Sequence, residues 1–267
     1  MKKYLSFFRL RFSMGLQYRV AAYAGCICQF VWGFMQIMMY HAFYRADATA
    51  FPMSLEEISS YIWLQQAFLA LFMAWLMENE IFDSIVDGNI AYELCRPINL
   101  YNMWFSRSVA NRISKAILRC VPILFVAVFL PKGYGIMLPK GAINTIMFFI
   151  TMILGLLVTV ALCMVVYMLT FFTVSQQGLR IFFVSSVEFL AGEVIPIPFF
   201  PEGLQKVVEL LPFASMQNVP LRVYSGNLSN HAMWKAIFMQ ILWLIVLFVL
   251  GKLIERKALK KVTLQGG

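Results

Sequence analysis

Residues 142–170 read AINTIMFFITMILGLLVTVALCMVVYMLT, and no charged side chain interrupts them. A membrane-spanning helix needs about 20 mostly apolar residues, because the hydrocarbon core of a bilayer is about 30 Å thick. The stretch exceeds this minimum and predicts a spanning helix. Five further apolar runs predict five more spans, namely 20–44, 58–77, 110–130, 179–195 and 232–254. The run at 179–195 is the weakest, because it contains Glu188 and continues into a proline-rich stretch.

The composition leads to the same conclusion. Of the 267 residues, 61% are apolar and only 13% are charged, whereas soluble domains carry about 25% charged residues. A soluble chain of this length could not hide so much apolar surface in one core. We therefore expect an all-α integral membrane protein with six transmembrane helices in a single domain, 1–267.

The first apolar run starts near Val20 and continues to Tyr44. This is too long for the apolar part of a cleaved signal peptide, so we expect a retained helix. Its orientation follows from lysine and arginine, which accumulate in cytoplasmic loops. With the N-terminus inside, the outer segments hold only Arg45, Lys132, Lys140, Lys206, Arg222 and Lys235 of the 22 basic residues. Both ends are therefore expected to be cytoplasmic, and the net charge of +9 indicates topology and attraction to anionic lipid rather than nucleic-acid binding.

Residues 1–19 precede the first span and combine apolar and basic side chains at helical spacing. This pattern favours a helix that lies at the cytoplasmic interface, although a simple basic flank remains the alternative. The residues are Leu5, Phe8, Phe12 and Leu16 on the apolar face and Arg9, Arg11 and Arg19 among them, while Phe7 and Leu10 point elsewhere.

The predicted cytoplasmic loop 78–107 contains a short amphipathic helix. Its apolar stripe is Ile81, Phe82, Ile85 and Val86, and its acidic side is Glu80, Asp83 and Asp87. Gly88-Asn89 can end this helix, since glycine adopts a left-handed C-terminal cap easily. Arg96-Pro97 prevents any continuation. Such a helix is suited to dock on another protein, with a position on the membrane surface as the alternative.

The predicted outer segment 192–226 is apolar and broken by prolines, unlike an ordinary exposed loop. This favours short helices that re-enter the membrane, which is tolerable only where protein or a water-filled cavity covers the freed backbone groups. A plain folded outer loop is the alternative. The residues concerned are Pro196, Pro198, Pro201, Pro212 and Pro220, with Phe199, Phe200, Leu210, Leu211 and Phe213.

Four of the charged residues within predicted spans are candidates for the transport pathway. Arg112, Lys115 and Arg119 share one helical face, where they either reach lipid phosphates or line an inner vestibule. Glu188 lies near mid-membrane if its span starts at Arg180. An acid there usually faces a partner or water, so Glu188 is a candidate for the transport pathway or a structural hydrogen-bonding residue.

Motifs for catalysis are absent from the sequence. No G-x-x-x-x-G-K-[ST] phosphate loop, H-E-x-x-H or G-x-S-x-G occurs. His41 and His231 are far apart, and the five cysteines lie in apolar or predicted inner segments. We therefore expect no catalytic residue, cofactor, metal site or disulfide framework in this chain.

Two stretches carry a family resemblance. Ile85-Val86-Asp87-Gly88-Asn89-Ile90 with Leu94-Cys95-Arg96-Pro97-Ile98 resembles the "I-x-x-G-x-I … L-x-R-P" run of one bacterial branch of the ABC-2 type permeases. Gly192-Glu193-Val194-Ile195-Pro196, Phe199-Phe200-Pro201 and Leu211-Pro212 resemble the "G-x-x-x-P … F-P … L-P" run of the same class. The order of the interfacial helix, six spans, inner loop helix and outer segment resembles these permeases along essentially the whole chain.

The resemblance implies a permease half of an ATP-driven exporter in a bacterial cytoplasmic membrane. Its partners would be a second permease copy or paralogue and two copies of a separate ATP-binding subunit, which would hold ATP and Mg²⁺. The implied ATPase-coupling residues are Glu80, Ile81, Asp83, Ile85, Asp87, Gly88, Arg96 and Pro97. The implied outer gate contains Gly192, Pro196, Phe199, Phe200, Pro201 and Pro212.

Two other classes remain as alternatives. A proton-coupled secondary transporter would use Glu188 as its relay, although it would need further buried ionisable groups and an internal repeat. A membrane-embedded lipid-processing enzyme would use Glu188, Glu193 or His231, but no paired carboxylates or Cys-His arrangement is evident in the sequence.

Overall fold

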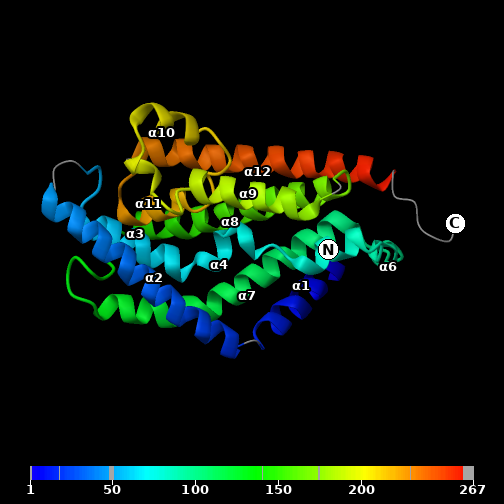
Figure 1. The fold of residues 1–267 in the computed structure, drawn as a ribbon, viewed down its shortest axis with the longest axis horizontal. Coiled ribbons are helices and arrows are strands. Elements are labelled where there is room, and N and C mark those ends of the chain that lie inside the picture. The colour runs from blue at the N-terminus through cyan, green and yellow to red at the C-terminus, as the bar shows by residue number, and fades with distance from the viewer. Residues whose placement is uncertain are drawn as a thin grey trace.

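The computed structural model describes residues 2–17, 19–47, 51–139, 141–173, 175–228 and 230–260. Within these ranges the chain is helical and contains no strand, as Figure 1 shows. The α-helices are α1 (Lys2–Gly15), α2 (Arg19–Ala46), α3 (Leu55–Ala67), α4 (Leu69–Phe72), α5 (Asn79–Val86), α6 (Ile90–Leu94), α7 (Leu100–Phe129), α8 (Ala142–Thr170), α9 (Gln176–Leu190), α10 (Glu202–Val208), α11 (Asn218–Ser225) and α12 (Asn230–Leu259), with short 3₁₀ helices η1 (Ala74–Leu76) and η2 (Ile197–Phe199).

Three of the described helices, α2, α8 and α12, are long and apolar enough to cross a membrane. They differ in their surroundings: 67% of the most apolar stretch of α8 is buried, against 28% for α2 and 22% for α12. Helix α8 packs against α7, α9, α11 and α12. It is therefore the centre of the bundle, whereas α2 and α12 leave most of their apolar surface for lipid or a partner.

The predicted span 58–77 is not a continuous helix, and that prediction is wrong in this respect. Helix α3 begins with a capping box between Ser54 and Glu57 and ends at Ala67. The short α4 follows, and Met73 then adopts an extended conformation before η1. The break frees backbone carbonyls inside the bundle, so it requires hydrogen-bond donors from elsewhere.

The predicted span 179–195 is also shorter than expected. Helix α9 contains 15 residues and ends at Leu190, which gives it a length of about 22 Å at 1.5 Å per residue. Gly192 has a φ of +76° and starts the turn into the outer segment. Helix α7 extends in the other direction: it covers the predicted span 110–130 but begins ten residues earlier, at Leu100.

The bundle that the described helices form is elongated and has two ends (Figure 1). The start of α1, α6 and the last turns of α12 lie toward one end, and α10 lies toward the other. Helix α1 packs along α7, so closely that a methyl group on Gly15 would meet Ser114 Oγ at 2.1 Å. Leu5 of the predicted apolar face is exposed, whereas Phe7, which was expected to point elsewhere, packs on the core; the interfacial position of α1 stays a prediction.

Candidate functional site

Helix α5 is anchored by one face and open on the other. Ile81 and Phe82 are fully buried and Ile85 is partly buried against the main core. Asp83 and Asp87 are exposed. The predicted stripe is wrong at its end, because Val86 is 58% exposed. An acidic surface with an apolar side chain therefore faces away from the bundle.

The turn between α5 and α6 continues this surface. Gly88 has a φ of +74° and nothing within 4 Å of a side chain added there, which confirms the glycine cap predicted from sequence. Tyr92, on α6, is 76% exposed. Arg96 and Pro97 are exposed after the end of α6, and Lys3 of α1 donates to the Pro97 carbonyl at 3.4 Å. We call Asp83, Val86, Asp87 and Tyr92 the α5–α6 surface.

Ion pairs fasten the start of α5 to α7 and α1. The guanidinium of Arg107 donates to the carboxylates of both Glu78 and Glu80, and its side chain is only 5% exposed. Ser108 Oγ donates to Glu78 at 3.1 Å. Arg11 lies 3.7 Å from Glu80. Burial and the neighbouring Arg107 lower the pKa of Arg11, against the opposing effect of Glu80, but an arginine stays charged at physiological pH.

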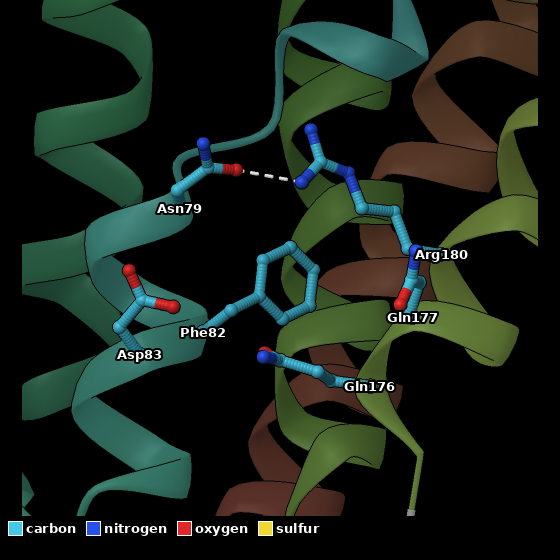
Figure 2. A pocket seen from close by; sticks show the side chains of 6 residues that line it. All are labelled: Asn79, Phe82, Asp83, Gln176, Gln177 and Arg180. Carbon is cyan, nitrogen blue, oxygen red and sulfur yellow. Dashed lines mark hydrogen bonds between the residues drawn. The ribbon is translucent and has the colours of Figure 1, made fainter.

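A second set of contacts joins α5 to α9, as Figure 2 shows. Arg180 donates to Asn79 Oδ1 at 2.6 Å and to the Trp75 carbonyl at 3.3 Å. Its guanidinium also lies 5.8 Å from the centre of the Phe82 ring. Asn79, Phe82 and Arg180 line a cavity of about 280 Å³ together with Asp83, Gln176 and Gln177. The cavity therefore lies between α5 and the first turn of α9.

Helix α8 provides the third set of contacts with α5. The Phe82 ring packs edge-on against Tyr167, with 5.0 Å between centroids. The Glu78 backbone N–H donates to the Tyr167 hydroxyl at 2.6 Å. Helix α5 is therefore held at once by α7, α8 and α9.

Arg112 is buried and bonded to backbone carbonyls. It is 4% exposed and donates to the carbonyls of Ala70, Leu71 and Met73 at 3.4, 3.2 and 2.9 Å. Ala70 and Leu71 lie in the last turn of α4, where an α-helix leaves its carbonyls without intrahelical partners, and Met73 is the extended residue that follows. A buried cation there also complements the negative end of a helix. Arg112 therefore stabilises the broken helix, and its role in an inner vestibule stays a prediction.

The other two cations on this face of α7 separate from each other. Lys115 lies beside Arg112, Glu78 and Tyr167 in a small internal pocket. Arg119 lies against α2, so closely that a methyl group on Gly25 would meet its guanidinium at 3.0 Å. Of the three residues predicted on one face of α7, Arg112 and Lys115 therefore lie at the small internal pocket, and Arg119 borders a second cavity.

This second cavity, which we call the glutamine cavity, has a volume of about 530 Å³. Its wall includes the amides of α2 and α3, two tryptophans, Arg119, Glu188 of α9 and Glu193 of the outer segment. Glu188 is thereby placed at a cavity rather than in lipid. The lining residues are Gly25, Cys28, Gln29, Trp32, Gln36, Gln65, Gln66, Leu69, Met73, Trp75, Arg119, Glu188, Glu193 and Val194.

Several polar atoms of the glutamine cavity have no partner among the described residues. Both side-chain amide atoms of Gln29, Oε1 of Glu193 and Nε of Arg119 are buried without a hydrogen bond. The remaining amides are engaged: Gln65 donates to the Glu193 carbonyl at 2.8 Å and Gln66 to Gln36 at 3.3 Å. Buried polar groups are nearly always satisfied, so unpaired atoms here point to water or a bound molecule.

The residues predicted for an outer gate occupy two clusters. The Phe199 ring lies 5.4 Å from that of Tyr40 on α2, whereas the Phe200 ring stacks 5.4 Å from that of Phe189 on α9. Gly192 forms the tight turn, where a methyl group would meet the Ile197 side chain and backbone at 3.0 and 3.1 Å. Pro196 precedes η2, Pro201 precedes α10 and is exposed, and Pro212 is buried.

Helix α11 is the part of the outer segment that enters the bundle. Most of its residues are buried, and it packs against α3, α8 and α12. Gly155 of α8 allows this approach, because a methyl group there would lie 2.4 Å from the Met216 carbonyl. The apolar, proline-rich sequence therefore forms short helices covered by protein on several sides.

Groups suited to hold a metal are not found in the described part of the chain, where no three His, Cys, Asp or Glu side chains cluster. All five cysteines are free. His231 begins α12 and is not in the wall of the glutamine cavity. The arrangement is one of anchored helices, a surface for contact and a polar cavity.

The sequence matches the model of the family described as "ABC-2 family transporter protein" over residues 30–266. The chain belongs to this family, and is therefore a membrane transport subunit of the permease type rather than an enzyme. Permeases of the family generally work with an ATP-binding subunit. Among curated proteins, none matches the chain.

Some of the site was not found from sequence. Arg107, Glu78 and Tyr167 were missed because they become partners only when α5 packs back on the bundle. The glutamines could have been found: Gln29, Gln36, Gln65 and Gln66 are amides inside predicted spans, and polar groups at membrane depth mark functional sites.

Proposed function

We propose that this protein is the permease subunit of an ATP-driven exporter and forms half of its translocation pathway. The other half would come from a second permease copy or a paralogue. A separate ATPase, present in two copies with its own ATP and Mg²⁺, would supply the energy. The observation that carries the proposal is helix α5, which is fastened on its inner side and open on its outer side.

The proposed coupling mechanism depends on the contacts of α5 with α7, α8 and α9. Closure of the two ATPase subunits would push the α5–α6 surface of each permease. Because Arg107 ties α5 to α7, Tyr167 ties it to α8 and Arg180 ties it to α9, the three helices would move together. Helix α9 ends at Gly192, so its displacement would reach the outer segment and open the gate near Phe199 and Phe200. Such coupling requires that the two states differ in contact energy with the ATPase.

The proposed topology has six crossings and cytoplasmic ends in a bacterial cytoplasmic membrane. Helices α2, α8 and α12 support three of them directly. Helices α3 with α4, α7 and α9 would supply the rest, the shorter ones being covered by neighbours. The excess of basic residues near α1, α6 and the end of α12 supports a cytoplasmic location for that end of the bundle.

The test is purification of the tagged chain from its host in mild detergent, followed by identification of the chains that accompany it. A stoichiometric ATP-binding subunit is expected. Replacement of Gly88 by proline should abolish ATP-dependent transport while the bundle still folds, because proline cannot adopt a φ of +74°. The matched control is Gly203→Ala in α10, where a methyl group meets nothing within 4 Å. Normal ATP-driven transport by Gly88→Pro would overturn the proposal.

One observation favours a proton-coupled secondary transporter as a second candidate. Glu193, 7% exposed, joins Glu188 in the same cavity, so the pathway holds two carboxyls instead of one. In that case transport would persist without ATP and would be lost in Glu188→Gln. The enzyme alternative gains no such support, since His231 is not in the wall of this cavity.

A further inference from the structure

The glutamine cavity has a polar floor and an aromatic rim. The floor is formed by buried side chains and the rim by exposed ones, which places hydrogen-bonding groups inside and apolar surface at the opening. The buried residues are Gln29, Gln65, Gln66, Met73 and Glu193, and the exposed ones are Cys28, Trp32, Trp75 and Val194.

The floor is incompletely satisfied. Gln29 is 5% exposed, yet neither its amide nitrogen nor its oxygen has a hydrogen-bond partner in the described structure. The same holds for Oε1 of Glu193. Burying such groups without partners costs free energy, and at membrane depth bulk water cannot repay it. The cavity is therefore built to receive groups that hydrogen-bond to it.

The chemistry of the floor selects the head group. Four amide side chains line the cavity, and each can donate and accept. Hydroxyls and amides match this dual character, whereas an ammonium only donates and a sulfate only accepts. The charged side chains are of both signs, since Glu188 opposes Arg119. An ionic head of either sign would thus meet a like charge, and a neutral head would not.

The rim selects the rest of the molecule. Trp32 and Trp75 are 58% and 42% exposed and border the same cavity as the amides. Indole rings offer large flat apolar surfaces for packing. The neighbouring face of α2 is also apolar and exposed, with Val31 and Met35 beside Trp32. An occupant with its head at the floor would keep its apolar body at this rim.

We propose that the glutamine cavity binds an amphiphile whose neutral head group carries both hydrogen-bond donors and acceptors, as hydroxyls or amides do. The head contacts Gln29 and its neighbouring amides, and the apolar body lies against Trp32 and Trp75. This inference rests on the proposed function in that it makes the cavity a substrate site of the exporter. Binding itself requires neither ATP nor the ATPase.

A natural reporter serves the test. Cys28 is an exposed free cysteine in the cavity wall, and Cys95→Ser with Cys120→Ser removes the other accessible thiols. The full chain in lipid nanodiscs is alkylated with a maleimide in the presence of four probes that share a dodecyl tail. They are dodecyl glucoside, dodecanamide, dodecylammonium and dodecyl sulfate. The rate of Cys28 alkylation is the measurement.

Slower alkylation with a neutral probe, and not with either ionic probe, is the expected result. Protection by the glucoside alone identifies hydroxyls, and protection by the amide alone identifies amides. In Gln29→Leu, the glucoside or amide concentration for half-protection should rise about tenfold, because two net hydrogen bonds are lost. Gln205→Leu, a glutamine of α10 outside this cavity, should leave it unchanged.

Three results overturn the inference: equal protection by all four probes, no protection by any of them, or protection that Gln29→Leu does not alter. Failure of Cys28 to react at all would contradict a hydrated cavity and overturn it too. Loss of fold does not confuse the test, because Gln29 has no partner to lose. If an ATP-binding subunit co-purifies while the probes fail, the exporter stands and only the substrate class falls. If the probes bind but no ATPase co-purifies, the proposed coupling falls instead.

Discussion

The start of α5 and the glutamine cavity both bring polar side chains into a largely apolar bundle, but they treat them differently. At α5, Arg107 is paired with Glu78 and Glu80, and Arg180 with Asn79 and a backbone carbonyl. In the cavity, both atoms of the Gln29 amide and one Glu193 oxygen are unpaired. The first region is a satisfied ion-pair network, which we call the clamp, and the second presents hydrogen-bonding groups without protein partners.

The difference indicates which region should be rigid and which should respond to a ligand. Satisfied polar networks fix a geometry, and loss of one member is costly because its partner is left buried. Unpaired groups contribute little to stability and can gain partners on binding. Substitutions in the two regions should therefore separate stability from ligand recognition.

The largest effect is expected for Arg107→Leu. The change leaves Glu78, whose side chain is 10% exposed, without its cation, and loss of one partner of a buried pair costs about 3–5 kcal/mol. The free energy of unfolding in detergent is the measurement. Glu78→Leu combined with Arg107→Leu should recover part of the loss. Equal stabilities of Arg107→Leu and the unaltered chain would contradict the clamp.

Arg112→Leu should be the next most damaging. It removes the donor to the three carbonyls at the break after α4, and hydrogen bonds from a charged group contribute about 1.5–3 kcal/mol each. We expect a loss of about 3 kcal/mol in the same unfolding measurement. Arg119→Leu, two turns later in α7, is the matched control and should cost far less, because its Nε has no partner. Similar losses for both would refute the assigned role of Arg112.

A smaller effect separates two buried glutamines. Gln240 of α12 donates to the carbonyls of Thr151 and Ser215 at 3.0 Å each, and such bonds in membrane proteins contribute about 0.6–1.7 kcal/mol. Gln240→Leu should therefore lower the free energy of unfolding by about 1–3 kcal/mol. Gln29→Leu should instead leave the free energy of unfolding unchanged or raise it, because it removes two buried polar atoms that have no partner. The comparison fails if Gln29→Leu is the more destabilising of the two.

The smallest change in free energy is expected at the α5–α6 surface. Val86→Glu places a charge where the ATPase is proposed to dock, and affinity for that subunit should fall about tenfold, which corresponds to about 1.4 kcal/mol. Titration of the purified ATPase onto the permease measures this affinity. Val207→Glu in α10 alters a valine of nearly equal exposure, 57% against 58%, and should have no effect. Equal effects of the two substitutions would exclude docking at α5.

Much of the fold could be predicted from sequence, because it depends on local patterns. The apolar run 142–170 became α8, and the glycine cap at Gly88 ends the loop helix as expected. The broken helix at 58–77 could not be predicted, because it exists only where Arg112 and Arg180 supply donors from distant positions. In a hydropathy profile, Arg112 belongs to the beginning of the predicted span 110–130, and Arg180 belongs to the beginning of the predicted span 179–195.

The candidate site was predicted in outline and missed in detail. The loop 78–107 was recognised from its stripe and its Gly88-Asn89 turn, but exposure of Val86 depends on how α5 tilts on α8. Glu188 was found because an acid within a span is conspicuous. The cavity around it was not, since it forms from α2, α3, α7 and α9 together.

The most direct test of the account is a photo-crosslink from the α5–α6 surface in the intact membrane. A benzophenone amino acid at Tyr92, which is 76% exposed, is compared with the same probe at Val207. An adduct from position 92 to an ATP-binding chain, with none from position 207, is the predicted result. If position 92 gives no adduct with an ATP-binding chain, or gives no more than position 207, α5 and α6 are not the coupling site and the proposed mechanism is wrong.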